Sequence, residues 1–297
     1  MFGNPPHPKS KTRIHWLPFL LQLATSWGWA QGALAATEFP DIDSLITESA
    51  ANAFVKLIGM GMDHRAYEPA TPLGTSLGLD VGLEATLVQP PSDLGTALSG
   101  LGGAMGGGSS SSSLTIPILP SPKLHLHKGL SNRIDIGLTG LYFPSLIPFV
   151  GGSYFVGGDV KIILFQPEEG LTWAFRMSYN VNSLTMSQSS IALSIKTGTY
   201  TPQLIVSRKL SFADPYMGMG YQISYGTFAA TITLPELPAP SPSLGDIVLS
   251  KNGTASGFLL FGGVGLRIPG VGFKFTIEGA YSPIGMNYLG TKISFAY

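Results

Sequence analysis

The sequence contains no cysteine and few charged residues. Of its 297 residues, 11% are Asp, Glu, Lys or Arg, whereas an ordinary soluble domain has about 25%. The absence of cysteine excludes a disulfide scaffold, a zinc–cysteine site and a cysteine nucleophile. Basic and acidic residues are equal at 17 each. Without a basic excess, we expect no nucleic-acid partner.

Long apolar runs are also missing after the first residues. This excludes a bundle of membrane helices, because each such helix needs about 20 consecutive apolar residues. Glycine (38) and proline (23), in contrast, are abundant. Together they make up about a fifth of the chain, whereas about 12% is usual. This composition favours a protein built from β-strands.

Residues 1–36 have the pattern of a secretory signal peptide. A basic start without acidic residues is followed by an apolar stretch over residues 16–30 and by small residues that place cleavage near Ala35. A single membrane anchor is the alternative, although Pro18 makes the apolar stretch a poor one. After residue 36 the chain keeps 14 basic and 17 acidic residues.

Beyond the signal, apolar residues alternate with small or polar ones. Residues 77–87 read LGLDVGLEATL, and residues 171–179 read LTWAFRMSY. Because successive side chains of a strand point to opposite faces, each strand has one apolar face. A soluble exported β-protein and a membrane barrel both give this alternation. Small residues in place of Lys and Glu on the polar face, and aromatics on the apolar face, favour the membrane barrel.

Ten segments carry this pattern, and we predict an all-β fold: a transmembrane antiparallel up-and-down β-barrel of about 10 strands (8–12) over residues 77–297. With both termini of the barrel chain in the periplasm, the long connections 89–114 and 230–254 fall on the outer side and the short ones on the inner side, as in bacterial barrels. The predicted strands are 77–88, 115–127, 132–143, 153–165, 171–181, 190–209, 215–229, 255–268, 272–282 and 287–297.

The sixth segment, residues 190–209, is irregular. Its apolar residues occupy odd positions at 191–195 and even positions at 204–206. Either a β-bulge near Pro202 shifts the register, since proline cannot donate a ladder hydrogen bond, or two elements are merged here.

Residues 41–66 differ from the rest, because their apolar residues recur at spacings of three and four. This spacing predicts a helix within an N-terminal segment, residues 37–76, that precedes the barrel. Two positions are open for it: it forms a plug or lid across the periplasmic mouth of the lumen, or it lies against the periplasmic rim.

The polar strand faces collect most of the charges, and we predict that these face the lumen and are the candidates for binding a solute. Because charges in a narrow barrel must be paired or hydrated, they either form an ion-pair network that fills a closed interior or line a conduit. The residues are Asp80, Glu84, Asp135, Asp159, Lys161, Arg176, Lys274 and Glu278, with Arg133, Arg267 and Lys292 also on polar faces.

Histidine occurs after the signal only at positions 64, 125 and 127. His125 and His127 share a strand face with Lys123, so they could meet a common metal or acid. The sequence identifies no third ligand. We therefore expect solvated or paired histidines, no metal, no cofactor and no catalytic residue. A barrel hydrolase that uses His with Asp or Ser is the less favoured alternative.

From residue 77 onward the chain resembles bacterial outer-membrane β-barrel proteins. The resemblance rests on the alternation and on the ending Gly290 to Tyr297, which is similar to the signal that directs such barrels to the insertion machinery. In this chain, Ile293 and Phe295 are followed by a further Ala-Tyr. The chain also resembles an uncharacterised family of predicted outer-membrane barrels with a helical N-terminal segment. The resemblance implies the outer membrane of a Gram-negative bacterium, with lipid and the insertion machinery as partners.

The expected function is a narrow or gated channel for small solutes. A barrel of ten strands is close to the size that interior side chains fill, and an open porin needs about 16–18 strands. The alternative is a non-conducting structural or surface-interaction barrel that displays the two long outer loops.

Overall fold

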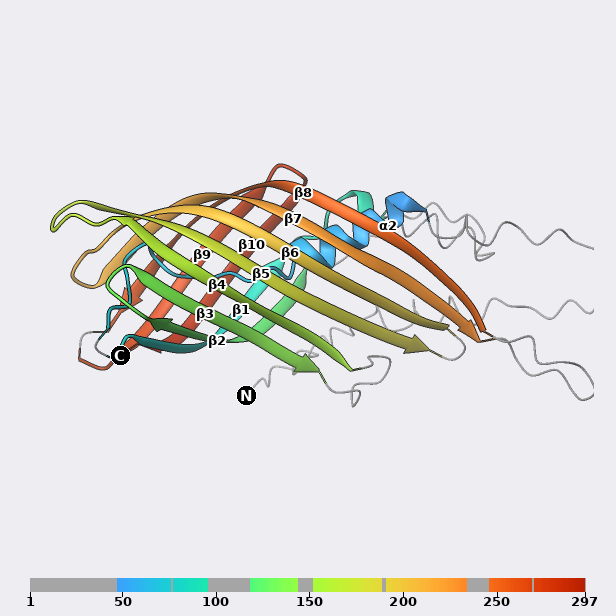
Figure 1. The fold of residues 1–297 in the computed structure, drawn as a ribbon, viewed down its shortest axis with the longest axis horizontal. Helices are drawn as coiled ribbons and strands as arrows, with labels where there is room; N and C mark the ends of the chain where they lie inside the picture. Colours follow the sequence, from blue (N-terminus) through green and yellow to red (C-terminus); the bar gives the residue numbers. More distant parts are fainter. Residues whose placement is uncertain are drawn as a thin grey trace, which may run out of the picture.

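The structure, a computed structural model, describes residues 47–75, 77–95, 118–143, 152–188, 191–233, 246–268 and 270–296. The predicted signal peptide lies outside these residues, as does most of the predicted connection 89–114. Ten antiparallel strands form a closed barrel in which β1 pairs with β10 (Figure 1). The fold class predicted from the sequence is therefore confirmed, including a short N-terminal helix.

The strands follow one another around the barrel in chain order. Their bounds are β1 Leu79–Val88, β2 Leu119–Gly129, β3 Ile134–Phe143, β4 Ser153–Phe165, β5 Leu171–Gln188, β6 Ile191–Arg208, β7 Ala213–Thr233, β8 Asp246–Arg267, β9 Phe273–Ser282 and β10 Met286–Ala296. None of the helices in the described part of the chain is long and apolar enough to cross a membrane.

The alternation of the sequence separates the two faces of the barrel wall. On β1, Leu83 and Leu87 point outward with 55% and 42% of their surfaces exposed, whereas Asp80 and Glu84 point inward and are fully buried. Large exposed apolar side chains recur on the outside of all ten strands. The barrel wall is thus apolar outside and carries its buried charges inside, which differs from the usual arrangement of a soluble protein.

Strands β5 to β8 are 18 to 22 residues long, whereas the other six have 10 to 13. The additional residues extend past the end of the β9–β10 hairpin and form an overhang on one side of the barrel (Figure 1). Two predicted connections were therefore too long. Residues 182–188 belong to β5, and β8 begins at Asp246 rather than at residue 255.

Neither alternative predicted for residues 190–209 is correct, because β6 is a single strand without a bulge. Tyr200 pairs with Ile223 and Gln203 with Gly220, so the register with β7 is the same on both sides of Pro202. Odd-numbered side chains point inward along the strand, and Ile195 is buried in the overhang against the N-terminal helix. The shift in the apolar pattern marks a change in what covers each face: the helix covers the inner face of the overhang.

The N-terminal helix is shorter than predicted. It comprises an α-helical part, α2 (Glu48–Val55), and a π-helical turn, η2 (Lys56–Met60), and residues 63–75 are not helical. Thr47 caps its start by accepting a hydrogen bond from the backbone N–H of Ala50 at 3.1 Å. An N-cap of this kind stabilises a short helix by about 1 kcal/mol.

The helix lies inside the overhang, at the end of the barrel away from the C-terminus (Figure 1). The expected position at the mouth that bears the chain ends is therefore wrong. Small residues permit the close contact with β8: a Cβ at Gly253 would lie 2.7 Å from the carbonyl carbon of Ala51. Phe54 stacks on Phe228 of β7 with ring centroids 4.7 Å apart. Packing, rather than helix propensity, fixes this position.

We predict that Phe228→Ala lowers the free energy of unfolding in detergent by about 3–5 kcal/mol, the usual cost of truncating a buried phenylalanine. The Phe228 side chain is 1% exposed and lies between the helix and the overhang. Urea titration followed by tryptophan fluorescence measures the change. The matched control is Phe212→Ala in the β6–β7 turn, where the ring is 65% exposed. Equal losses in both variants would contradict the packing described here.

Candidate functional site: the filled lumen

Residues Ala50–Leu73, called here the plug segment, cross the inside of the barrel from the overhang to the end that bears the C-terminus. At one end the Asn52 side-chain oxygen accepts from the backbone N–H of Thr254 at 2.7 Å. At the other, the N–H of Leu73 donates to the Asp135 carboxylate at 3.2 Å. Apart from Met62, residues 57–71 are all buried. The segment fills the lumen that the strands enclose.

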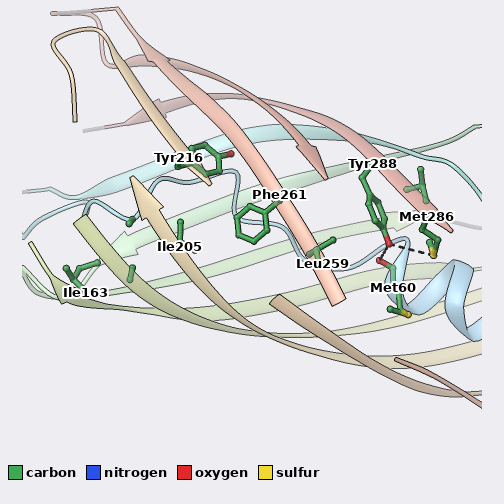
Figure 2. Packing of buried hydrophobic residues seen from close by; sticks show 11 residues of the cluster. Met60, Ile163, Ile205, Tyr216, Leu259, Phe261, Met286 and Tyr288 are labelled. Carbon is green, nitrogen blue, oxygen red and sulfur yellow. Dashed lines mark hydrogen bonds between the residues drawn. The ribbon is translucent and has the colours of Figure 1, made fainter. Parts of the chain in front are cut away.

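The upper half of the plug segment, residues 50–62, lies towards the overhang and is held by apolar contacts. Leu57 and Ile58 pack with Ile195 and Phe228 in one buried cluster. A second cluster continues along the lumen and includes Met60, Met286 and Tyr288, whose positions Figure 2 shows. The Tyr288 hydroxyl donates to the Met60 carbonyl oxygen at 3.5 Å. This half resembles the core of a soluble domain.

The lower half, residues 63–73, is an extended chain that pairs with no strand of the barrel. Side chains of the barrel wall must therefore donate to its carbonyl groups. Cations from the strands supply the donors. Lys123 donates to the Asp63 carbonyl at 2.7 Å, Arg176 to the His64 carbonyl at 3.1 Å and Lys292 to the Ala66 carbonyl at 3.4 Å. Lys161 donates to two carbonyls, those of Pro69 and Thr71, at 3.1 and 3.0 Å. Four wall cations thus hold this chain in one path.

Glu68 is the plug segment's main anionic contact. Its Oε1 atom lies 2.6 Å from Lys292 Nζ and 3.1 Å from Lys274 Nζ. Asp80 approaches the same ammonium groups at 3.2 and 3.5 Å. All four side chains are at most 3% exposed. Two carboxylates and two ammonium groups therefore balance one another in a site without water-exposed charge, as buried ions require.

Arg65 makes a second link between plug and wall. Its guanidinium lies 3.4 Å from Glu278 Oε1 and 3.9 Å from the centre of the Tyr288 ring. The other oxygen of Glu278 accepts a hydrogen bond from Tyr216 at 2.8 Å. A guanidinium over an aromatic face adds a cation–π attraction, which is strongest where water is excluded.

A third polar group lies around Asp159 on β4. Its Oδ2 atom is 2.5 Å from His64 Nε2, 3.2 Å from His127 Nε2 and 2.8 Å from Arg176 Nη2. His125 Nε2 lies a further 2.9 Å from His127 Nε2. The plug segment supplies His64, and the strands supply the other residues.

The structure places all eight of the strongest sequence candidates inside the barrel, where each is at most 8% exposed, and it also buries Lys292. It excludes Arg133, which is exposed beside the β2–β3 turn, and places Arg267 at the rim, 41% exposed beside Asp214. The buried candidates are Asp80, Glu84, Asp135, Asp159, Lys161, Arg176, Lys274 and Glu278.

Four plug side chains that complete these groups were not among the predicted site residues: Asp63, His64, Arg65 and Glu68. A usable signal was present, because residues 63–68 read DHRAYE and hold three charged residues and a histidine in a chain with only 11% charged residues. Such a run next to a barrel that carries both signs on its inner face indicates a segment that pairs with the wall.

No protein-family model and no curated protein matches the sequence. Among solved structures, the chain is similar to the outer membrane protease OmpT from Escherichia coli, with 12% identity, a TM-score of 0.44 and coverage of 74% of this chain and 96% of that one. It is also similar to Ail, the attachment invasion locus protein of Yersinia pestis, with 10% identity, a TM-score of 0.29 and coverage of 73% of this chain and 93% of that one. A third similar structure is the Acinetobacter baumannii outer membrane protein Omp33, with 7% identity, a TM-score of 0.29 and coverage of 74% of this chain and 97% of that one.

We predict that Gly290→Ala loosens the plug segment. A Cβ at Gly290 would overlap the Tyr67 hydroxyl, which is buried and hydrogen-bonded to Thr86. Overpacking of this kind costs about 1–3 kcal/mol, so limited proteolysis should cut the plug segment sooner than in the unmodified protein. The control is Gly279→Ala on the neighbouring strand, where a Cβ meets nothing within 4 Å. Equal cleavage rates in the two variants would count against the close contact.

Proposed function

We propose that the protein is an outer-membrane β-barrel that acts as a gated channel for small polar solutes, with the plug segment as its gate. The observation that carries the proposal is the polar contact between the lower half of the plug segment and the wall. Most of the charged side chains that hold it belong to the strands, so the lumen stays hydrophilic when the segment moves.

A membrane location is supported by the outer surface. Side chains such as Leu124 and Phe258 are 64% and 65% exposed, and many others like them cover the outside of the barrel. Apolar patches of this extent are rare on monomeric soluble proteins. The shortest strands have 10 residues, which matches the about 9–11 that a tilted strand needs to cross a bilayer.

The choice of a gated channel over a permanently filled barrel rests on energetics. A core that never opens is at least as stable when it is apolar, because burying ion pairs costs desolvation free energy. Here the buried charges of the strands comprise five cations and six carboxylates, of which Asp214 pairs with Arg267 at the rim. A displaced plug leaves a narrow lumen with nearly balanced charge, which suits small polar solutes of either sign.

The non-conducting alternative draws support from the overhang, because an apolar contact with the helix stabilises a projecting structure that a channel does not need. A hydrolase has less support. All three histidines after residue 36 are buried, with at most 4% of each side chain exposed, so a macromolecular substrate does not reach them in this conformation.

We predict that Glu68→Gln raises the open probability in planar bilayers. The substitution leaves the ammonium groups of Lys274 and Lys292 with Asp80 as their one remaining carboxylate, and removing one partner of a buried ion pair costs about 3–5 kcal/mol. Deleting residues 47–66 should go further and give larger, discrete conductance steps. Single-channel recording of the refolded protein measures both effects.

Asp214→Asn is the matched control, because it removes a buried carboxylate that pairs with a strand residue rather than with the plug segment. It should behave as the unmodified protein. Insertion of each variant is verified by heat-dependent migration on a gel. Silence from the deletion variant, once insertion is shown, contradicts the channel and leaves the structural role.

The orientation can be tested in cells because the chain has no cysteine of its own. Ser49 and Ser211 are both exposed and lie at opposite ends of the barrel. With the C-terminal end in the periplasm, a membrane-impermeant maleimide should label Ser49→Cys on intact cells. Ser211→Cys should react only after the outer membrane is permeabilised. The reverse pattern would contradict the proposed orientation.

A further inference from the structure

Every histidine that follows residue 36 meets at one point inside the barrel. His64 comes from the plug segment, whereas His125 and His127 come from β2. The ring centres lie 4.1 to 6.1 Å apart, and none of the three side chains is more than 4% exposed. The sequence predicts the pair on β2 but identifies no third ligand. The fold provides one, His64 from the plug segment, with Asp159 as a fourth polar group.

The donor atoms have the spacing of a metal centre. His64, His127 and Asp159 each offer one ligand atom, and these atoms all lie within 4.8 Å of one another. The contacts to Asp159 Oδ2 are 2.5 Å from His64 Nε2 and 3.2 Å from His127 Nε2. Ligands about 2.0–2.1 Å from a tetrahedral zinc ion are about 3.3 Å apart, so small movements are enough to admit the ion.

Carboxylates lie behind the two wall histidines. His125 Nδ1 is 3.0 Å from Glu84 Oε2, and His127 Nδ1 is 3.7 Å from Glu68 Oε1. Histidines that bind metals commonly donate their other ring N–H to a carboxylate, which fixes the tautomer and directs the free lone pair at the ion. His125 has that arrangement here, whereas the Glu68 oxygen lies beyond hydrogen-bond distance of His127 and contributes only its charge.

When His127 also carries its hydrogen on Nδ1, the two rings are in a conflict that a cation removes. With hydrogen on Nδ1 of both rings, the Nε2 lone pairs of His125 and His127 face each other across 2.9 Å. Neither atom can then donate to the other. A positively charged species that both nitrogens approach turns this repulsion into two favourable contacts.

We propose that His64, His127 and Asp159 bind one divalent transition-metal ion, with His125 as a further or exchanging ligand and zinc as the best-matched ion. Imidazole and carboxylate are ligands that zinc accepts, whereas calcium and magnesium prefer oxygen alone. Arg176, 2.8 Å from Asp159 Oδ2, keeps that carboxylate in place. Because His64 lies on the plug segment and the other ligands on the wall, the ion cross-links the two. The proposed site stands whether or not the barrel conducts.

The test uses the full mature chain, refolded in detergent from metal-free buffer and then dialysed against Zn²⁺. Elemental analysis should give one zinc per chain. His64→Gln and His127→Gln should each weaken zinc binding by at least about 100-fold, and Glu84→Gln by about 10–100-fold, as is usual for a carboxylate behind a ligand. Asp214→Asn, a buried carboxylate that contacts no histidine, should bind zinc as tightly as the unmodified chain.

A second measurement does not depend on variants. Co²⁺ bound to the unmodified chain should show the visible absorption of a tetrahedral nitrogen and oxygen site, and equimolar Zn²⁺ should remove it. Folding of each variant is checked by its heat-dependent gel migration. Zinc bound equally well by the histidine variants, or a Co²⁺ spectrum of the hydrated ion alone, overturns the proposal and leaves a shared proton between the two wall histidines.

Discussion

An extended chain inside a barrel has no strand beside it, and its peptide groups must be satisfied by side chains of the wall. This constraint governs the lower half of the lumen. The carbonyls of Asp63, His64 and Ala66 each accept from a lysine or arginine of a different strand. Every such donor brings a charge that must be balanced in turn. The carboxylates of Asp80, Glu84 and Asp159, each of which pairs with one of these cations, follow from that need. The plug backbone therefore accounts for much of the charge in the wall.

The two halves of the plug segment are held by different forces. Towards the overhang, alanines of α2 and the Phe54–Phe228 stack give an apolar contact, which is about as favourable for a helix in a barrel as in a soluble core. Towards the C-terminal end, the contacts are ion pairs and hydrogen bonds that water can replace. In the gating that we propose, displacement therefore begins in the lower half, while the helix remains attached.

The sequence predicted the barrel well because a strand wall has two environments and a period of two. Leu83 outside and Glu84 inside follow from one line of alternating residues. The same rule failed at β6, where Ile195 is apolar and inward because a helix covers it. Periodicity shows that the faces differ, and it does not show what each face contacts. That information lies in the N-terminal segment, which is distant in sequence.

Only those site residues that lie on the strands could be predicted from the sequence. Position along a strand assigns Asp159 and Lys161 to the lumen without knowledge of anything else in it. The plug residues lie in an irregular segment whose path is set by its partners, so no local pattern places His64 beside Asp159 or Glu68 beside Lys292.

The balance of buried charges indicates where in the lumen a further cation is favourable. Apart from Asp214, which Arg267 at the rim balances, the buried charges of the strands comprise five cations and five carboxylates. Adding the plug segment's Asp63, Arg65 and Glu68 gives the interior a net excess of one carboxylate. A buried excess of negative charge is costly unless a cation offsets it. The wall histidines, with two carboxylates behind them, are where that cation, a proton or a metal ion, is most favourably held. The electrostatics of the whole lumen and the geometry of the histidine group therefore point to the same place.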